Sequence, residues 1–286
     1  MYHFPIGIIA DSFRKPMPEA LATAAKLGAK GVQVYATRGE MSPEELTGQK
    51  RRDFLAMVKD NGLVISALCG DLGRGFGNPE LNPQLIQRSK RILDLAKELE
   101  TNIVTTHIGV TPADENHPRY KIMQDACGEL AAYADSLDAH FAIETGPETS
   151  ETLKHFLDSL HSTGVAVNLD PANLVMVGAD DEVTAVKTAG SLIVHTHAKD
   201  GCSLKKIAPA DFYHNFAEGG LEWASTCGVC RETPLGEGAV RWVPYLSALK
   251  EIGYNGYLTI EREVKNGAED IRMAVSFLRK TLETQQ

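Results

Sequence analysis

The chain lacks any long hydrophobic segment. No stretch is apolar over the roughly 18 residues needed to cross a bilayer. The N-terminal residues MYHFPIGIIADSF do not contain a basic leader followed by a sustained apolar run, as a secretory signal would. We therefore expect a cytoplasmic protein with no membrane partner.

Basic residues are also fewer than acidic residues. The sequence has 29 Lys and Arg residues against 38 Asp and Glu residues, which gives a formal net charge of -9. Such a surface repels phosphate backbones. The one basic cluster, Lys50 to Arg52, opens a helical pattern and is expected to be a solvated helix face. We expect no nucleic-acid partner.

Cysteine is too scarce for a disulfide framework. Five cysteines in 286 residues is an odd number, which is typical of reduced thiols in a chain of this size. Cys227 and Cys230 form a single CGVC motif, and only Cys202 or His214 offers a further ligand nearby. We interpret this motif as a loop feature rather than a zinc site, and its role stays open.

What the sequence does contain is a regular alternation of short, β-branched apolar runs with amphipathic helical segments. Four of these segments are PEALATAAKLG, SPEELTGQKRRDFLAMVKDNG, NPQLIQRSKRILDLAKELE and RWVPYLSALKEIG. The predicted strands are Ile6 to Ala10, Gly31 to Tyr35, Val64 to Leu68, Ile103 to His107, Phe141 to Glu144, Val165 to Asp170, Leu192 to His197 and Tyr257 to Glu261.

Alternating strands and helices predict a parallel sheet, which is either doubly wound or closed as a barrel. The count of eight strands favours the barrel. No GxGxxG or Walker-type loop follows the first strand, where a doubly wound nucleotide-binding fold would place one. We therefore predict an α/β fold with a single (β/α)8 TIM barrel over residues 1–286.

Two loops of the predicted barrel stand out. GDLGRGFGNP, after the third strand, is rich in glycine and is interpreted as a lid-like loop. Gly201 to Gly238 is the longest irregular stretch and follows the seventh strand. Loops of this length are usually functional, and this one lies at the face where barrel enzymes carry out their chemistry.

Four predicted strands end in side chains that can bind a metal: Glu144, Asp170, His197 and Glu261. In a closed barrel these strand ends converge on one opening. One such acidic residue alone is most often a helix N-cap or a salt-bridge partner, but four in register are hard to explain that way. Three carboxylates and one imidazole predict one divalent metal, with Mn²⁺ favoured over Co²⁺, Mg²⁺ or Zn²⁺.

At HTHAKD and PLGEGAVRWVPYLSALKEIGYNGYLTIERE the chain resembles the xylose-isomerase-like TIM-barrel superfamily, which includes D-tagatose 3-epimerase, inosose dehydratase and endonuclease IV. The resemblance covers nearly the whole chain. It implies that Glu144, Asp170, His197 and Glu261 bind the catalytic metal. His195, two residues before His197 on the same strand face, is expected one layer deeper and is included as a substrate contact.

The resemblance also implies roles for other residues. Arg231 matches an R-x-x-P arginine that epimerases place over the substrate, although a surface role is equally open. Asn173 stands where epimerases often have a histidine. His107, at the end of the fourth predicted strand, is expected in the site as a catalytic residue. Further candidates, each with an equally plausible structural role, are Lys199, Asp200, Glu263, Phe212 and Trp223.

Three functions follow from the resemblance. The first is a metal-dependent sugar isomerase or epimerase that forms an ene-diolate, with Glu144 and Glu261 as the acid/base pair. The second is a lyase or dehydratase that eliminates a β-substituent from a 3-keto sugar or an oxidised glycoside, with His107 as an extra base. The third, an endonuclease-IV-like phosphodiesterase, is opposed by the net charge and by CRETPLGEG, which lacks the Asp-x-His of that branch.

A small sugar is the expected substrate. The expected assembly is a homo-oligomer or, for a lyase, a complex with a small β-rich subunit.

Overall fold

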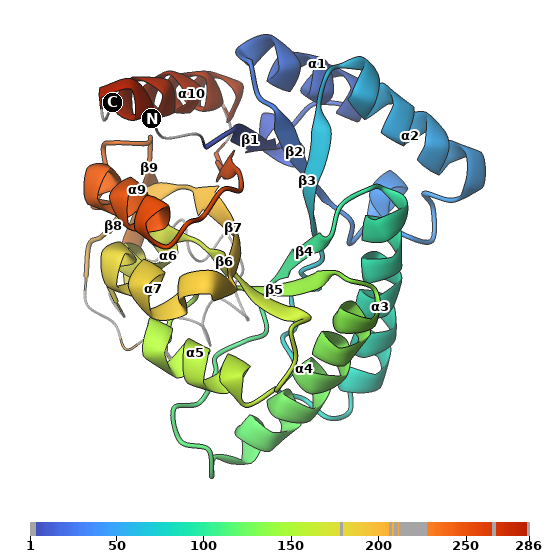
Figure 1. Ribbon diagram of the computed structural model, residues 1–286, viewed down its shortest axis with the longest axis vertical. Coiled ribbons are helices and arrows are strands. Elements are labelled where there is room, and N and C mark those ends of the chain that lie inside the picture. Colours follow the sequence, from blue (N-terminus) through green and yellow to red (C-terminus); the bar gives the residue numbers. More distant parts are fainter. Residues whose placement is uncertain are drawn as a thin grey trace.

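Eight parallel strands close into a barrel in this computed structural model (Figure 1). The structure describes residues 4–177, 180–205, 208, 211, 228–264 and 267–284. The strands neighbour one another in the order β1-β10-β7-β6-β5-β4-β3-β2, so the first strand closes the barrel against the last. Their bounds are β1 Ile6–Ile9, β2 Gly31–Tyr35, β3 Val64–Cys69, β4 Ile103–Thr106, β5 His140–Glu144, β6 Val165–Leu169, β7 Ile193–Ala198 and β10 Leu258–Ile260.

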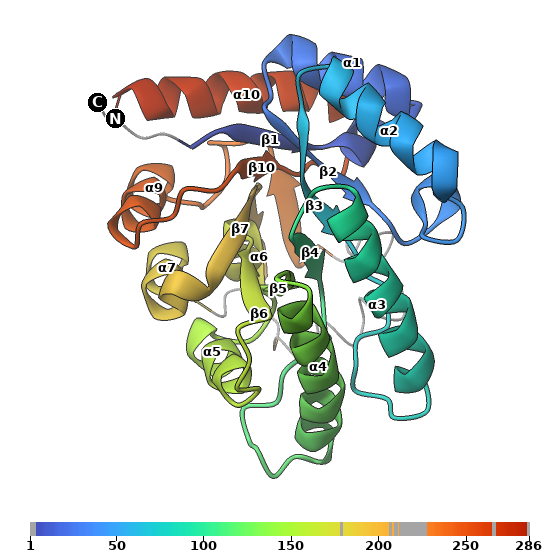
Figure 2. The ribbon, with the colours of Figure 1, turned by 45° about the vertical axis from the view of Figure 1, so that its right-hand side comes forward.

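Helices surround the strands, as Figure 2 shows most clearly for α3, α4, α5 and α7. The main helices of the described residues are α1 Met17–Leu27, α2 Gly48–Asp60, α3 Asn82–Glu98, α4 Pro118–Ser136, α5 Ser150–Asp158, α6 Pro171–Val177, α7 Glu182–Ala189, α9 Trp242–Glu251 and α10 Gly267–Thr284. Short 3-10 turns are η1 Ala10–Phe13, η2 Gly39–Met41 and η3 Gly190–Leu192. In these ranges, no helix combines the length and the apolar character of a membrane span.

The prediction of a (β/α)8 barrel is confirmed, and each predicted strand overlaps an observed one. One helix is shorter than predicted. The segment that begins at Ser42 forms turns as far as Thr47, and α2 begins only at Gly48. Pro43 has no N–H, and Thr47 has an extended backbone at the helix N-cap, so the early residues cannot continue into the helix.

The stretch predicted to be irregular after the seventh strand is paired at both ends. Its first residues form β8 (Asp200–Ser203), which pairs antiparallel with β9 (Cys230–Thr233). The pairing was missed because each strand has only four residues and CRET shows no apolar alternation. Phe212, Trp223 and Cys227 lie outside the described residues.

Alternation along β7 shows how the barrel separates its inner and outer layers. His195 and His197 contact polar side chains from other strands of the barrel, whereas Thr196 between them bonds to the hydroxyl of Tyr245 on α9. Successive residues of a strand point to opposite faces. The strand therefore packs α9 on one side and presents two imidazoles to the barrel interior on the other.

Candidate metal centre

The four predicted ligands lie together at the carboxyl ends of their strands. Glu144 is the last residue of β5, Asp170 follows β6, His197 is the penultimate residue of β7 and Glu261 follows β10. One potential ligand atom from each lies within 4.8 Å of the others, and all four residues are buried. Within the described ranges this is the one group of at least three His, Cys, Asp or Glu residues placed to hold a metal ion.

The distances inside the group fit a cation. Nδ1 of His197 lies 2.9 Å from Oε2 of Glu261, 3.5 Å from Oε1 of Glu144 and 3.6 Å from Oδ2 of Asp170. Ligands that each bind one ion at about 2.1 Å are separated by similar distances. Three of the atoms, Nδ1 of His197, Oδ2 of Asp170 and Oε2 of Glu261, are buried without a hydrogen bond to any described residue. Unsatisfied buried polar atoms are costly, and one shared cation would satisfy all three.

The charges of the site also suit a cation. Burial raises the pKa of Glu144, but His107 and His197 outweigh it and hold the pKa below its ordinary value. Burial likewise raises the pKa of Glu261, which Lys199 and His197 outweigh. Both carboxylates are therefore ionised at neutral pH. For His197, burial lowers the pKa but Glu261 and Glu144 raise it well above the ordinary value, so a metal ion would bind in place of a proton.

Gln33, which the sequence analysis did not single out, orients the histidine ligand. This buried residue of β2 donates from Nε2 to Oγ1 of Thr105 at 3.0 Å, so its Oε1 faces Nε2 of His197 at 3.1 Å. An amide oxygen only accepts, so Nε2 of His197 carries a proton, and Nδ1 faces the carboxylates, where it would present its lone pair to a cation that replaces its proton. A partner of this kind on the far nitrogen fixes the ring and the tautomer of a metal-binding histidine.

A second chain of hydrogen bonds holds Glu144. Nδ2 of Asn168 donates to Oε2 of Glu144 at 3.0 Å, which turns Oδ1 of Asn168 toward Nδ1 of His195 at 2.8 Å. Nδ1 of His195 must then donate, and Nε2 accepts from the hydroxyl of Thr259 at 3.0 Å. Burial and the neighbouring His197 lower the pKa of His195 well below its ordinary value, so the ring is neutral. Both of its nitrogens are engaged, so the ring supports Asn168 from below, and its expected contact with the substrate stays a prediction.

Asn173 lies beside the ligands, as predicted from its place in the motif. It is on α6, three residues after Asp170, and its Nδ2 donates to Oε1 of Glu144 at 3.1 Å and to the carbonyl of Thr145 at 3.2 Å. Oδ1 of Asp170 accepts from the backbone N–H groups of Ala172 and Asn173, which leaves only Oδ2 free for a cation. The turn that starts α6 therefore fixes two ligands at once.

His107 also reaches the group. It follows β4, and its Nε2 lies 3.6 Å from Oε1 of Glu144 while its Nδ1 lies 3.0 Å from Oδ2 of Asp71. Burial opposes the charge on this ring, but Glu144 and Asp71 outweigh it and raise the pKa of His107 to about 10. Asp71 was not predicted. It stands two residues after β3 in a glycine-rich loop, a position that carries no signal in the sequence.

Lys199 and Glu263 line the same opening. The ammonium of Lys199 is buried, 3.4 Å from Oε2 of Glu261, 3.9 Å from Oδ2 of Asp170 and 3.8 Å from Oε2 of Glu263. Burial lowers its pKa, but these carboxylates outweigh it, so Lys199 is a cation. Glu263 is half-buried, and burial raises its pKa to about 7.

Asp200 and Arg231 do not join the cluster. The carboxylate of Asp200 is buried and accepts from the backbone N–H groups of Gly201, Gly236, Gly238 and Val240 and from Nε1 of Trp242. It anchors the end of the loop after β9. Arg231 is exposed on β9, opposite Cys202 in β8. Its proposed contact with the substrate stays a prediction.

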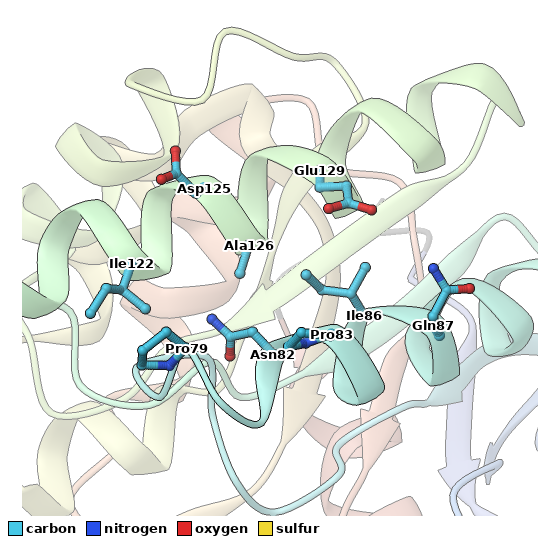
Figure 3. Close-up of a pocket in the computed structure, with 9 residues that line it drawn as sticks. All are labelled: Pro79, Asn82, Pro83, Ile86, Gln87, Ile122, Asp125, Ala126 and Glu129. Carbon is cyan, nitrogen blue, oxygen red and sulfur yellow. The ribbon is translucent and has the colours of Figure 1, made fainter.

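A separate groove of about 450 Å³ lies between α3 and α4, and its lining includes none of the four candidate ligands (Figure 3). Its lining includes Asn82, Ile86 and Ala126. The two carboxylates at its edge, Asp125 and Glu129, are paired with Lys121 and Lys90. No cluster of chemically active groups lies there, so the metal centre is the better candidate for the functional site.

The chain belongs to the xylose isomerase-like TIM barrel family, whose sequence model matches residues 21–281.

Three solved structures resemble the structure of this chain over nearly their whole length. A xylose isomerase domain protein from Planctomyces limnophilus is 23% identical, with a TM-score of 0.79 and coverage of 99% of this chain and 98% of that chain. The probable 3-DHS dehydratase AsbF from Bacillus anthracis is 18% identical, with a TM-score of 0.73 and coverage of 96% and 98%.

The third is the 3-keto-D-glucoside 4-epimerase YcjR from E. coli, in its apo form. It is 15% identical, with a TM-score of 0.72 and coverage of 98% of this chain and all 100% of that chain. At such identities the likeness shows a common fold. Epimerases and a dehydratase share that fold, so it does not distinguish isomerisation from elimination.

Proposed function

We propose that this xylose isomerase-like barrel is a metal-dependent enzyme that isomerises or epimerises a ketose or keto-sugar through an ene-diolate. The observation that carries the proposal is the pairing of Glu144 and Glu261. Both carboxylates are buried, ionised and within 3.5 Å of the same imidazole nitrogen, in a group with unsatisfied atoms directed at one point. A proton-transfer pair needs such fixed, charged groups around one reacting carbon.

The roles of the individual side chains follow from their contacts. Glu144 is held by Asn168 and Asn173, which keeps its carboxylate in one orientation for abstracting a proton from the substrate. Glu261 faces Lys199 and returns the proton to the neighbouring carbon or to the opposite face of the same carbon. A bound divalent cation, held by Glu144, Asp170, His197 and Glu261, would supply the positive charge that stabilises the ene-diolate. The favoured ion is Mn²⁺, since the donor set is mostly oxygen.

A lyase acting on a 3-keto sugar or an oxidised glycoside is the second candidate. His107 favours it. Its Nε2 lies 3.6 Å from Glu144, and a cation bound by the carboxylates would offset the negative charge that raises the pKa of the ring, so that His107 would serve as an additional base for an elimination. A probable 3-DHS dehydratase among the structural neighbours supports this candidate. A lyase would be expected to assemble with a small β-rich partner subunit, whereas an epimerase would be expected to form a homo-oligomer.

Incubation of the Mn²⁺-loaded protein in D₂O with a panel of sugars tests the proposal. The panel contains D-fructose, D-tagatose, D-psicose, a 3-keto-D-glucoside and an oxidised aryl glycoside, and proton NMR follows the products. We expect an isomer of the substrate that carries deuterium at one carbon, with no water or fragment released. Release of water or of an aglycone, without exchange on the free ketoses, would replace the proposal with the lyase function.

Two substitutions identify the proton-transfer groups. Glu144→Gln and Glu261→Gln are nearly isosteric and remove only charge, so each is expected to abolish deuterium exchange while the fold is retained. Glu237→Gln is the matched control, because Glu237 is exposed on the loop after β9 and touches none of the ligands. Exchange at the parent rate in either active-site variant would exclude that residue as acid or base.

A further inference from the structure

The loop between β3 and α3 is clamped to the loop that follows β4. The backbone N–H of Gly70 donates to the carbonyl of Thr105 at 2.8 Å, and that of Phe76 donates to the carbonyl of Ile108 at 2.9 Å. Gly75 has a φ of +60°, and a Cβ at this position would lie 2.7 Å from the carbonyl oxygen of Ile108. The glycines therefore permit close backbone contact. These bonds attach part of the GDLGRGFGNP segment to the loop after β4, and its interpretation as a lid-like loop stays a prediction.

The clamped loop holds the carboxylate of Asp71 at both oxygens. Oδ1 accepts from the backbone N–H of Gly73 at 2.8 Å, and Oδ2 lies 3.0 Å from Nδ1 of His107. Because an ionised carboxylate only accepts, Nδ1 of His107 is the donor of the second bond. The other ring nitrogen, Nε2, is directed toward Glu144 and the metal centre.

We propose that Asp71 is a positioning residue, which holds a proton on Nδ1 of His107 and thereby makes Nε2 the ring atom that contacts the substrate. Every donor or acceptor function of His107 in the site then passes through Nε2. This arrangement is the same whether the ring is neutral or charged, since Nδ1–H is present in both forms. Asp71 itself lies behind the ring and touches no substrate.

The geometry points to one property of the substrate. A ring nitrogen fixed 3.6 Å from a ligand of the metal centre is placed to hydrogen-bond a hydroxyl on a carbon adjacent to the metal-chelating oxygens. This step rests on the proposed function. A polyhydroxylated sugar satisfies Nε2, whereas an analogue without that hydroxyl leaves a partly buried polar atom unpaired and is rejected.

Nitrogen-15 NMR of the Mg²⁺-loaded protein tests the inference without using activity. Long-range proton–nitrogen correlations distinguish a protonated from an unprotonated Nδ1, and His107→Gln identifies the His107 signals. We expect Nδ1 to be protonated in the parent protein. Asp71→Leu, which removes the acceptor and keeps the branched shape, is expected to place the proton of the neutral ring on Nε2, in spectra recorded at a pH high enough to deprotonate the imidazolium. Asp71→Asn keeps a carbonyl acceptor and should retain the proton on Nδ1.

Two controls accompany the spectra. His155 lies on the surface beside Glu115, so its signals should be the same in every variant. Bound metal should also be unchanged, because Asp71 does not touch the ligands. An unprotonated Nδ1 in the parent protein, or a spectrum of Asp71→Leu identical to that of the parent, would overturn the inference.

Activity gives a second readout on whichever sugar the panel identifies. Asp71→Leu should lower kcat/KM at least about tenfold, which is the effect of losing one hydrogen bond to a charged group. The kcat/KM of Asp71→Asn should lie closer to that of the parent. Equal activity of Asp71→Leu and the parent would overturn the role of Nε2. If the parent converts no sugar, the proposed function fails, while the nitrogen spectra still decide the position of the proton.

Discussion

At the scale of the residue, the metal centre depends on amides that are not themselves ligands. Gln33 fixes the ring of His197, and Asn168 fixes the carboxylate of Glu144. Each amide donates with one end and accepts with the other. The carboxylate of Glu144 only accepts, which imposes the orientation of Asn168, and the hydroxyl of Thr105 donates to the carbonyl of Leu68 and so accepts from Gln33.

Gln33→Leu should weaken metal binding about 10–100-fold, because the far nitrogen of His197 loses the acceptor that fixes its tautomer. Isothermal titration calorimetry of the metal-free protein with Mn²⁺ measures the change in affinity. Gln33→Glu is the matched control, since a carboxylate still accepts from Nε2 and should keep affinity near that of the parent. Equal affinities for the leucine variant and the parent would show that packing alone orients the ring.

Glu148 gives a prediction about pH. Burial raises the pKa of its carboxyl from the ordinary 4.5 to about 7, and its Oε2 has no hydrogen bond with the described residues. Between these two values the folded state keeps a proton that the unfolded state has lost, so the stability falls as the pH rises. Above about 7 the loss is complete.

Glu148→Gln lacks this ionisation. Compared with the parent, its free energy of unfolding should therefore increase steadily from pH 4.5 to pH 7 and then stay higher by a constant amount. Urea titrations of both proteins at several pH values measure the difference. A difference that is independent of pH would mean that Glu148 titrates normally.

The strand-end ligands could be predicted from the sequence, whereas their supports could not. Glu144, Asp170, His197 and Glu261 each end an apolar run, and the convergence of strand ends in a barrel places them together. Gln33 and Asn168 lie inside strands, where a buried amide in an apolar run such as VQVY was a signal that could have been used. The position of Asp71 depends on backbone hydrogen bonds between the glycine-rich loop and the loop after β4, and these contacts are known only from the three-dimensional structure.

At the scale of the element, the carboxylate of Asp200 ties the two-stranded sheet of β8 and β9 to the segment that leads into α9. Asp200→Ala would leave four backbone N–H groups and the indole N–H of Trp242 without their acceptor. Buried donors without partners cost about 1–3 kcal/mol each. We expect a loss of at least about 3 kcal/mol in the free energy of unfolding.

Denaturation with guanidinium chloride measures this loss, with Glu237→Gln as an exposed control on the same segment. Asp200→Asn retains one acceptor oxygen and should fall between Asp200→Ala and the parent. A loss below about 1 kcal/mol in Asp200→Ala would show that water replaces the carboxylate.

At the scale of the whole molecule, the centre concentrates three carboxylates in the barrel interior, and their mutual repulsion opposes folding. A cation that binds only the folded state stabilises it by about 2.7 kcal/mol at 100 times its Kd. For a chain of this size, that corresponds to a rise in Tm of roughly 5 °C or more.

Thermal unfolding of the chelator-treated protein across a series of Mn²⁺ concentrations measures this rise. Glu261→Gln, which lacks one ligand charge, should show little dependence of Tm on the ion. A parent Tm that does not depend on Mn²⁺ would contradict the assignment of the centre.

The closure of β1 against β10 has a consequence for the order in which the protein is made. During synthesis the chain delivers Glu144, Asp170 and His197 first, and Glu261 emerges only with the last strand, whose partner is the first. A nascent chain therefore holds three of the four ligands without the strand that completes the ring. A cation held by all four residues would therefore bind fully only at the final step of folding, because an incomplete polypeptide lacks the complete ligand set.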